Sequence, residues 1–294
     1  MKRTGLLLPT LLYDVKQGIV HRWRWYWIPV LLFAICWLSF YIQIVKPIYG
    51  AEKQLSNTTV ADSLLYLFRG DPGFDARSDE NHFLLPTRWM CIFVGSLICS
   101  IEYVGTDLDS YMQQILVRRG GRRFWWISKF IWVCLSTILY CILGYAAVMI
   151  CSSIRSLSFS LSTSKIMTEI IIGSDRLKDS QAQNVVNNII LLFGIPLLFM
   201  LCLNIVQLCV SLFVGKQFSL LLCVTILILS SYFHSPVFFG SYAMVIRSNL
   251  FVQNGMQPTE GIIIYFSIIL VCFFFGQWRI DTLDFLQVPR NGEV

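Results

Sequence analysis

The side chains best placed to do chemistry in this 294-residue chain are basic groups in the stretch GTDLDSYMQQILVRRGGRRFWWISK, residues 105–129. Apolar runs precede and follow it, and a basic cluster between hydrophobic segments is typical of a cytoplasmic loop in a membrane protein. The cluster acts through its positive charge, which can set the orientation of the flanking segments in the membrane and present a charged surface to the cytoplasm. Its basic residues are Arg118, Arg119, Arg122, Arg123 and Lys129.

Motifs for catalysis are missing from the sequence. No Gly-x-x-x-x-Gly-Lys-Ser/Thr phosphate-binding loop, His-Glu-x-x-His or Gly-x-Ser-x-Gly occurs, and the three histidines are scattered. All ten cysteines lie in or beside apolar runs, which argues against a disulfide framework and a metal site. We therefore expect a protein that is not an enzyme, with no catalytic, cofactor-binding or metal-binding residues, and any energy input must come from a partner.

The first half of the basic stretch predicts a short amphipathic helix. An apolar set recurs there at helical spacing: Leu108, Tyr111, Met112, Ile115 and Leu116. Asp107 and Asp109 stand near its start, where carboxylates favour a helix. The pair Gly120 and Gly121 then ends it. The loop therefore presents one end of a helix to the cytoplasm.

Composition places the chain in a membrane. Hydrophobic residues make up 56% and charged residues 14%, and the mean hydropathy is +0.65, far from the averages of soluble proteins. The net charge of +6 is spread over loops that flank apolar segments, so membrane topology explains it better than nucleic-acid binding does. We predict an all-α membrane protein, a single domain over residues 1–294, with no nucleic-acid partner.

Six apolar segments are predicted to be transmembrane helices: residues 25–45, 83–104, 124–151, 189–214, 218–233 and 262–278. The basic residues place both termini and the loop at 105–123 in the cytoplasm, so the chain is expected to be a multi-pass protein of the plasma membrane. Residues 1–24 predict an amphipathic helix in the headgroup plane, with Asp14 off its apolar stripe. Residues 46–82 and 152–188 are expected to form external polar loops.

The fifth apolar segment is short, and His234-Ser235-Pro236 interrupts the sequence after it. The apolar piece that follows, residues 237–246, predicts a short re-entrant or interfacial helix before the last span. The alternative is one long kinked helix that ends at Arg247.

The fourth span carries two amides, Asn204 and Gln207, on one face, and Pro196 predicts a kink before them. Amides at such depth usually form hydrogen bonds between helices. Lining a translocation path is the alternative for this pair. The centres of the predicted spans hold no acidic or basic residue, whereas ion-coupled carriers usually place one there.

The layout resembles the permease subunit of bacterial ABC transporters of the ABC-2 exporter type. The likeness rests on a helix, Arg-Arg-Gly-Gly-Arg-Arg, aromatic residues and Ser-Lys before the third span, on the leading amphipathic helix and on the broken fifth segment. It implies that residues 105–123 form a coupling helix that docks on an ATPase. The contact residues are then Asp107, Asp109, Tyr111, Ile115, Arg118, Arg119, Arg122 and Arg123.

The resemblance further implies the partners. ATP and Mg would bind to a separate ATPase dimer. A second permease chain, identical or related, would complete the membrane unit. The cargo would be amphipathic, such as a peptide antibiotic or a lipid. Two other functions stay open. One is a non-transporting membrane protein that recruits or senses a partner through the basic loop, and the other is a carrier that works without ATP.

Overall fold

The computed structural model describes residues 7–49, 58–73, 85–109, 122–174, 177, 185–253 and 255–282. Within these ranges the chain is helical, and strand pairing is limited to isolated bridges such as that between Thr59 and Ser158. Four helices are long and apolar enough to cross a membrane: Trp23–Ile48, Arg122–Ile154, Val185–Val214 and Pro258–Thr282. The chain is therefore an all-α protein with four candidate membrane-spanning helices.

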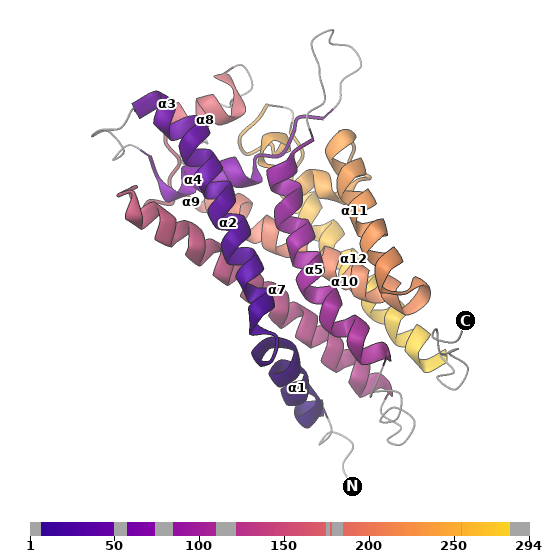
Figure 1. Ribbon diagram of the computed structural model, residues 1–294. Coiled ribbons are helices and arrows are strands. Elements are labelled where there is room, and N and C mark those ends of the chain that lie inside the picture. The colour runs from indigo at the N-terminus through magenta and orange to yellow at the C-terminus, as the bar shows by residue number, and fades with distance from the viewer. Residues whose placement is uncertain are drawn as a thin grey trace, which may run out of the picture.

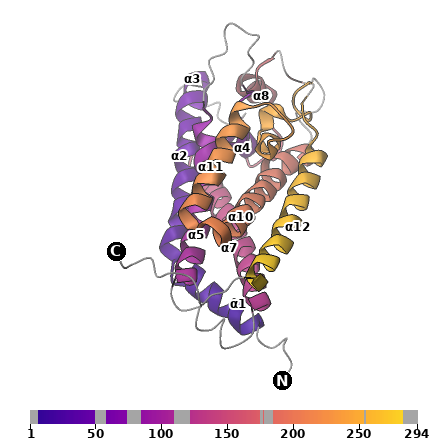
Figure 2. The ribbon, with the colours of Figure 1, turned by 90° about the vertical axis from the view of Figure 1, so that its right-hand side faces the viewer.

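A bundle of long helices forms the body of the molecule (Figures 1 and 2). Its members are α2 (Trp27–Phe40), α5 (Thr87–Asp109), α7 (Arg122–Ile154), α10 (Ile195–Val214), α11 (Lys216–Tyr232) and α12 (Pro258–Thr282). Two of the six predicted spans, in α5 and α11, are shorter apolar helices. The central helix is α7, which packs against α1, α2, α5, α10 and α12.

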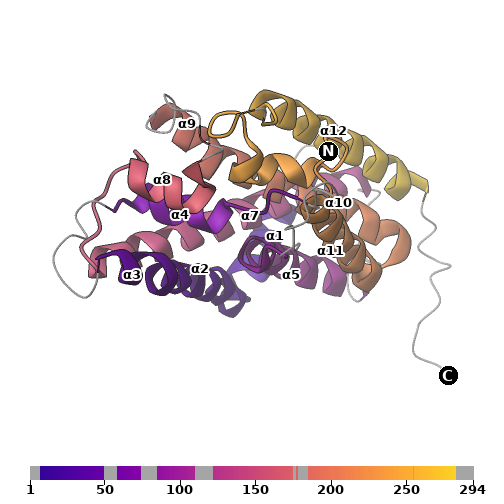
Figure 3. The same cartoon turned by 90° about the horizontal axis from the view of Figure 1, so that it is seen from above.

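The two ends of the bundle carry different elements (Figures 1 and 3). One end, here called the α1 end, holds α1 (Leu7–Val15), the first turn of α7 and the last turn of α12. The opposite end, here called the α4 end, gathers four short helices. They are α3 (Lys46–Tyr49), α4 (Val60–Phe68), α8 (Lys165–Ile172) and α9 (Val185–Ile189).

The helix α1 turns its polar side toward the protein. Asp14 is buried, as is Gly18 in the π-helical turn Lys16–Val20 that continues α1, whereas Leu8 and Leu12 remain more than 60% exposed. A side chain at Gly18 would meet the Trp132 ring of α7 at 2.4 Å, so only glycine permits this close approach. The sequence predicts an amphipathic helix in the headgroup plane, and an apolar stripe on the outside of the protein fits that position. The prediction did not include the contact of Asp14 with protein, which a buried carboxylate needs.

The segment predicted as an external polar loop, residues 46–82, contains the helix α4, all nine residues of which are buried. Its start is a capping box in which Thr59 and Asp62 each accept a hydrogen bond from the other's backbone N–H. The second Asp62 oxygen accepts the backbone N–H of Ser164, which caps α8. One buried carboxylate therefore joins the first turns of two helices. Residues 152–188, predicted as the second external polar loop, likewise contain a helix, α8.

The kink predicted at Pro196 takes the form of a π-helical turn, Ile190–Gly194, between α9 and α10. Pro196 has no N–H to give to the Leu192 carbonyl four residues earlier. The Tyr145 hydroxyl of α7 donates to that carbonyl at 3.0 Å. A neighbouring helix thus satisfies the acceptor that the proline leaves open.

After α11 the chain leaves the helix axis at Phe233, so the alternative of one long kinked helix is wrong. Residues 237–246, predicted as one short re-entrant or interfacial helix, contain short helical turns of the 3₁₀ type in place of a single helix. The two turns, η8 (Phe239–Ala243) and η9 (Val245–Arg247), are buried at the α4 end.

The buried Arg247 explains this arrangement. Its guanidinium donates to the Ser230 carbonyl at 2.7 Å and to the Ser231 carbonyl at 2.6 Å, both in the last turn of α11. It also donates to the Asp71 carbonyl, at 2.7 Å, beyond the end of α4. Burial lowers the pKa of Arg247 to about 10, so the group stays charged at neutral pH and complements the carboxyl end of α11.

Candidate functional site

The amides predicted on the fourth span lie in a buried polar cluster where α5, α7 and α10 meet. Asn204 Nδ2 donates to Ser96 Oγ of α5 at 2.6 Å and to Thr137 Oγ1 of α7 at 2.9 Å. Its Oδ1 lies 2.8 Å from Ser100 Oγ of α5. All these groups are at most 4% exposed. The Asn204 amide therefore links three helices, with both protons of Nδ2 donated and Oδ1 within hydrogen-bonding distance of Ser100 Oγ.

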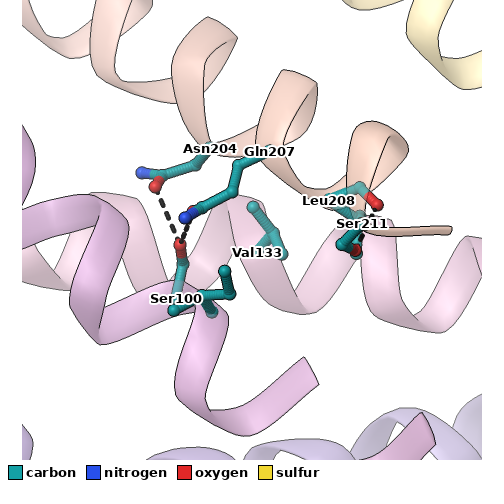
Figure 4. A pocket seen from close by; sticks show the side chains of 7 residues that line it. Ser100, Val133, Asn204, Gln207, Leu208 and Ser211 are labelled. Carbon is teal, nitrogen blue, oxygen red and sulfur yellow. Dashed lines mark hydrogen bonds between the residues drawn. The ribbon is translucent and has the colours of Figure 1, made fainter. Parts of the chain in front are cut away.

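Gln207 joins the same cluster one turn later on α10. Figure 4 shows it extending with Asn204 toward Ser100. Its Oε1 lies 3.0 Å from Ser100 Oγ, and its Nε2 has no hydrogen-bond partner among the described residues. A small cavity lies beside it. The volume within which the centre of a water-sized sphere fits is about 10 Å³. The cavity is lined by Ser100, Ile101, Val133, Asn204, Gln207, Leu208 and Ser211.

A second buried network, here called the Asp14 network, lies at the α1 end. Lys129 Nζ of α7 lies 2.7 Å from Asp14 Oδ1 of α1, and both side chains are fully buried. Tyr103 of α5 donates to the same oxygen at 2.7 Å, and Ser128 donates to the other. Lys129 Nζ also lies 4.2 Å from the centre of the Tyr103 ring. The buried charges are thus paired and hydrogen-bonded, as a site in an apolar bundle requires.

The two networks share helix faces. Ser100 and Tyr103 are three residues apart on α5, while Lys129 and Val133 are four apart on α7, and such pairs are neighbours on a helix surface. Since Ser100 and Val133 line the cavity, the cavity lies about one turn from the Asp14 network along both helices. Lys129 lies only about two turns from the start of α7, so the buried charge is near the end of that span.

The structure describes part of the predicted ATPase contact. Tyr111, Ile115, Arg118 and Arg119 lie outside the described residues. Asp107 and Asp109 belong to the last turns of α5, which continues beyond the predicted end of the second span at residue 104.

Arg122 and Arg123 begin α7 and face the end of α12. Arg122 donates to the Asp281 carbonyl at 3.2 Å, and Arg123 pairs with the Asp281 carboxylate at 3.3 Å. The Arg123 side chain is 75% exposed, so this ion pair is worth about 0–1 kcal/mol. These two arginines therefore contribute to a contact between helices at the α1 end.

The sequence patterns do not predict the serine, threonine and Asp14 partners of these networks. A signal was present in α5, where Ser96, Ser100 and Tyr103 follow helical spacing within an apolar segment. Asp14 in α1 and Gly18 in the π-helical turn that follows it, four residues apart, mark the polar and small face. These patterns identify a face, but they do not identify the helix that it contacts.

The chemistry of these groups favours hydrogen bonding and charge pairing. In the described part of the chain, no three His, Cys, Asp or Glu side chains come together as a metal site would require, and all ten cysteines are free thiols. Comparison of the chain with protein-family models, curated proteins and solved structures finds no match. Function must therefore be argued from the architecture and the sites themselves.

Proposed function

We propose that the chain is the membrane subunit of an ABC exporter, driven by a separate ATPase that binds to the loop between α5 and α7. We also propose that α5 and α11 cross the membrane, giving six spans. α5 has 23 residues and extends over about 35 Å, but its apolar part, Thr87–Ile101, reaches only about 22 Å, so flanking residues must complete a crossing of about 30 Å. The 17 residues of α11 reach about 25 Å, so the bilayer thins locally or the flanking residues complete the crossing.

The observation that carries the proposal is the way in which the α1 end is tied together. The Asp14 network joins α1 to α5 and α7, which are the two helices that flank the loop. Asp281 joins the start of α7 to the end of α12. A partner that pulls or pushes on the loop would therefore act on four helices through short polar contacts, which suits a transport subunit that receives force from an ATPase.

Two alternatives remain as outcomes of the test. A membrane protein that only recruits a partner would bind through the loop without transport. A carrier that works without ATP would move its substrate with no ATPase present. The apolar character of the bundle favours an amphipathic cargo, such as a peptide antibiotic or a lipid, under the main proposal.

The decisive experiment looks for an ABC ATPase gene beside that of the chain, co-expresses the ATPase with the full chain, and measures co-purification and ATP hydrolysis in lipid nanodiscs. We expect no hydrolysis by the chain alone and hydrolysis by the complex. Tyr111→Ala with Ile115→Ala removes two predicted apolar anchors, and such losses cost an interface about 1–4 kcal/mol, or roughly fivefold to a thousandfold in affinity. The matched control, Gln113→Ala with Gln114→Ala, changes the other face of the same predicted helix and should bind normally.

The outcomes separate the functions. If no ATPase binds to the wild-type chain, the proposal fails and the carrier or the recruiting protein gains support. If an ATPase binds but its hydrolysis drives no export, the recruiting protein is favoured. If both double variants bind and export normally, the loop is not the coupling element.

Topology is tested separately with single cysteines in a cysteine-free background. Cysteines at positions 57 and 181 should react with a membrane-impermeant thiol reagent in intact cells, whereas one at position 120 should react only after the cells are opened. If α5 does not cross the membrane, positions 57 and 120 will label alike. A cysteine at position 216 compared with one at position 253 tests α11 in the same way.

A further inference from the structure

The Gln207 amide has an unfinished set of hydrogen bonds. Its side chain is 1% exposed, and Nε2 has no partner among the described residues. A buried amide donor without a partner is costly, because it loses its hydrogen bonds to water on burial. The position therefore calls for a further group next to Gln207.

Rotating the amide does not remove this need. Ser100 Oγ lies within 3.1 Å of three acceptors, namely the Leu97 carbonyl, Asn204 Oδ1 and Gln207 Oε1, but a hydroxyl has only one proton to donate. Exchanging Oε1 and Nε2 of Gln207 reduces this competition from three acceptors to two, because Nε2 can then donate to Ser100 Oγ. Oε1 then takes the place of Nε2 and is left without a donor. In either orientation one atom of the amide needs a partner.

The cavity beside Gln207 is built for that partner. Its volume of about 10 Å³ for the centre of a water-sized sphere is close to the room that one water molecule needs. Ser211, one turn after Gln207 on the same face of α10, also lines the cavity. The Ser211 hydroxyl donates its proton to the Leu208 carbonyl at 2.8 Å, so its oxygen remains available as an acceptor.

We propose that a single buried water molecule binds in this cavity between the Gln207 amide and the Ser211 hydroxyl. Water suits both orientations of the amide, because it can donate and accept, and a buried water needs two to four polar partners. It extends the polar cluster from Ser100 on α5 to the last turns of α10. The inference depends on the geometry of the bundle alone and stands whether or not the chain is a transporter.

The direct test is an experimental structure of the full chain in nanodiscs at a resolution that shows ordered water. We expect one density peak within hydrogen-bonding distance of the Gln207 amide and Ser211 Oγ. X-ray footprinting in H₂¹⁸O gives a second readout, since radiolysis of a bound water oxidises the side chains that touch it. Leu208 and Val133 should take up label, whereas Leu203, which is equally buried but does not line the cavity, should not.

Variants make the test specific. Gln207→Leu should lose both the density peak and the labelling of Leu208, and Ser211→Ala should weaken both if Gln207→Leu fails to fold. Thr225→Ala, an exposed site on α11 whose hydroxyl bonds only within its own helix, should leave both unchanged. A wild-type map with no peak at this position, or labelling of Leu208 that persists in Gln207→Leu, would overturn the proposal.

Discussion

Asp14 of α1 and Lys129 of α7 form an ion pair with 2.7 Å between Oδ1 and Nζ, and neither side chain is exposed. Removing two charges from water is expensive, and the cost is offset here by their attraction and by donors from Ser128 and Tyr103. The pair therefore acts as a matched unit. Loss of one partner leaves a buried charge without its counterion.

Lys129→Met and Asp14→Asn should each destabilise the protein by about 3–5 kcal/mol, because each leaves an uncompensated charge. The double variant should lose less than the sum of the two single losses, since it contains neither charge. The measurement is equilibrium unfolding in mixed micelles. Arg123→Gln, which removes an exposed ion pair of the same end, serves as the control and should change stability by no more than about 1 kcal/mol. Strictly additive single losses would contradict the assignment.

The stability cost of a substitution at Tyr145 should depend on the residue at position 196, as the costs at Asp14 and Lys129 depend on each other. Tyr145→Phe leaves the Leu192 carbonyl without its donor and should cost about 1–3 kcal/mol. In a Pro196→Ala background the restored backbone N–H can serve that carbonyl, so the same Tyr145→Phe change should cost less. Unfolding of the four proteins of this cycle measures the difference. An equal cost in both backgrounds would mean that the hydroxyl does not compensate for the proline.

The sequence predicts the long helices well because each is a sustained apolar run, and a membrane or a packed bundle leaves such a run few alternatives to a helix. It misses α4, since this run of nine residues stands among polar residues and is too short to cross a membrane. The capping box that begins with Thr59 was the available signal.

The contact of the polar face of α1 with protein could not be predicted, for a different reason. An amphipathic stripe shows that a helix has two faces, but in a membrane protein lipid can cover the apolar face and protein the polar one. Asp14 is thus a surface group in the sequence and a buried ion-pair partner in the structure. Arg247 is a similar case, because its carbonyl partners come from α11 and from the segment after α4, which only the folded chain brings together.

Arg247→Lys should loosen the end of α11. A lysine keeps the charge, but a single ammonium cannot reach the carbonyls of Asp71, Ser230 and Ser231 as the planar guanidinium does. Each buried carbonyl left without a donor costs about 1–3 kcal/mol. Hydrogen exchange of residues 230–238 should therefore become faster, with a lower melting temperature. Thr225→Ala, in the middle of α11, should leave exchange there unchanged, and unchanged exchange in Arg247→Lys would contradict this role.

Asp62 should make stability depend on pH. It lies at the α4 end, outside the candidate spans, and burial raises its pKa to about 6 although hydrogen bonds from Thr59 and Ser164 act in the opposite direction. The ordinary value is 3.8. Between about pH 4 and pH 6 the folded state therefore holds a proton that the unfolded state has released. The free energy of unfolding should fall as the pH rises through this window and level off above it.

The matching variant is Asp62→Asn, which cannot ionise. Its single amide oxygen cannot accept from both Thr59 and Ser164, so it should be less stable than the wild type by about 1–3 kcal/mol at neutral pH. Its stability should change less between pH 4 and pH 6. Glu169→Gln, at an exposed position on α8, is the control and should keep the wild-type slope. The opposite result would be stability that rises with pH in the wild type but not in Asp62→Asn. It would mean that the N–H groups at the two helix amino termini lower the pKa of Asp62 by more than burial raises it, so that the carboxylate is ionised in the folded protein.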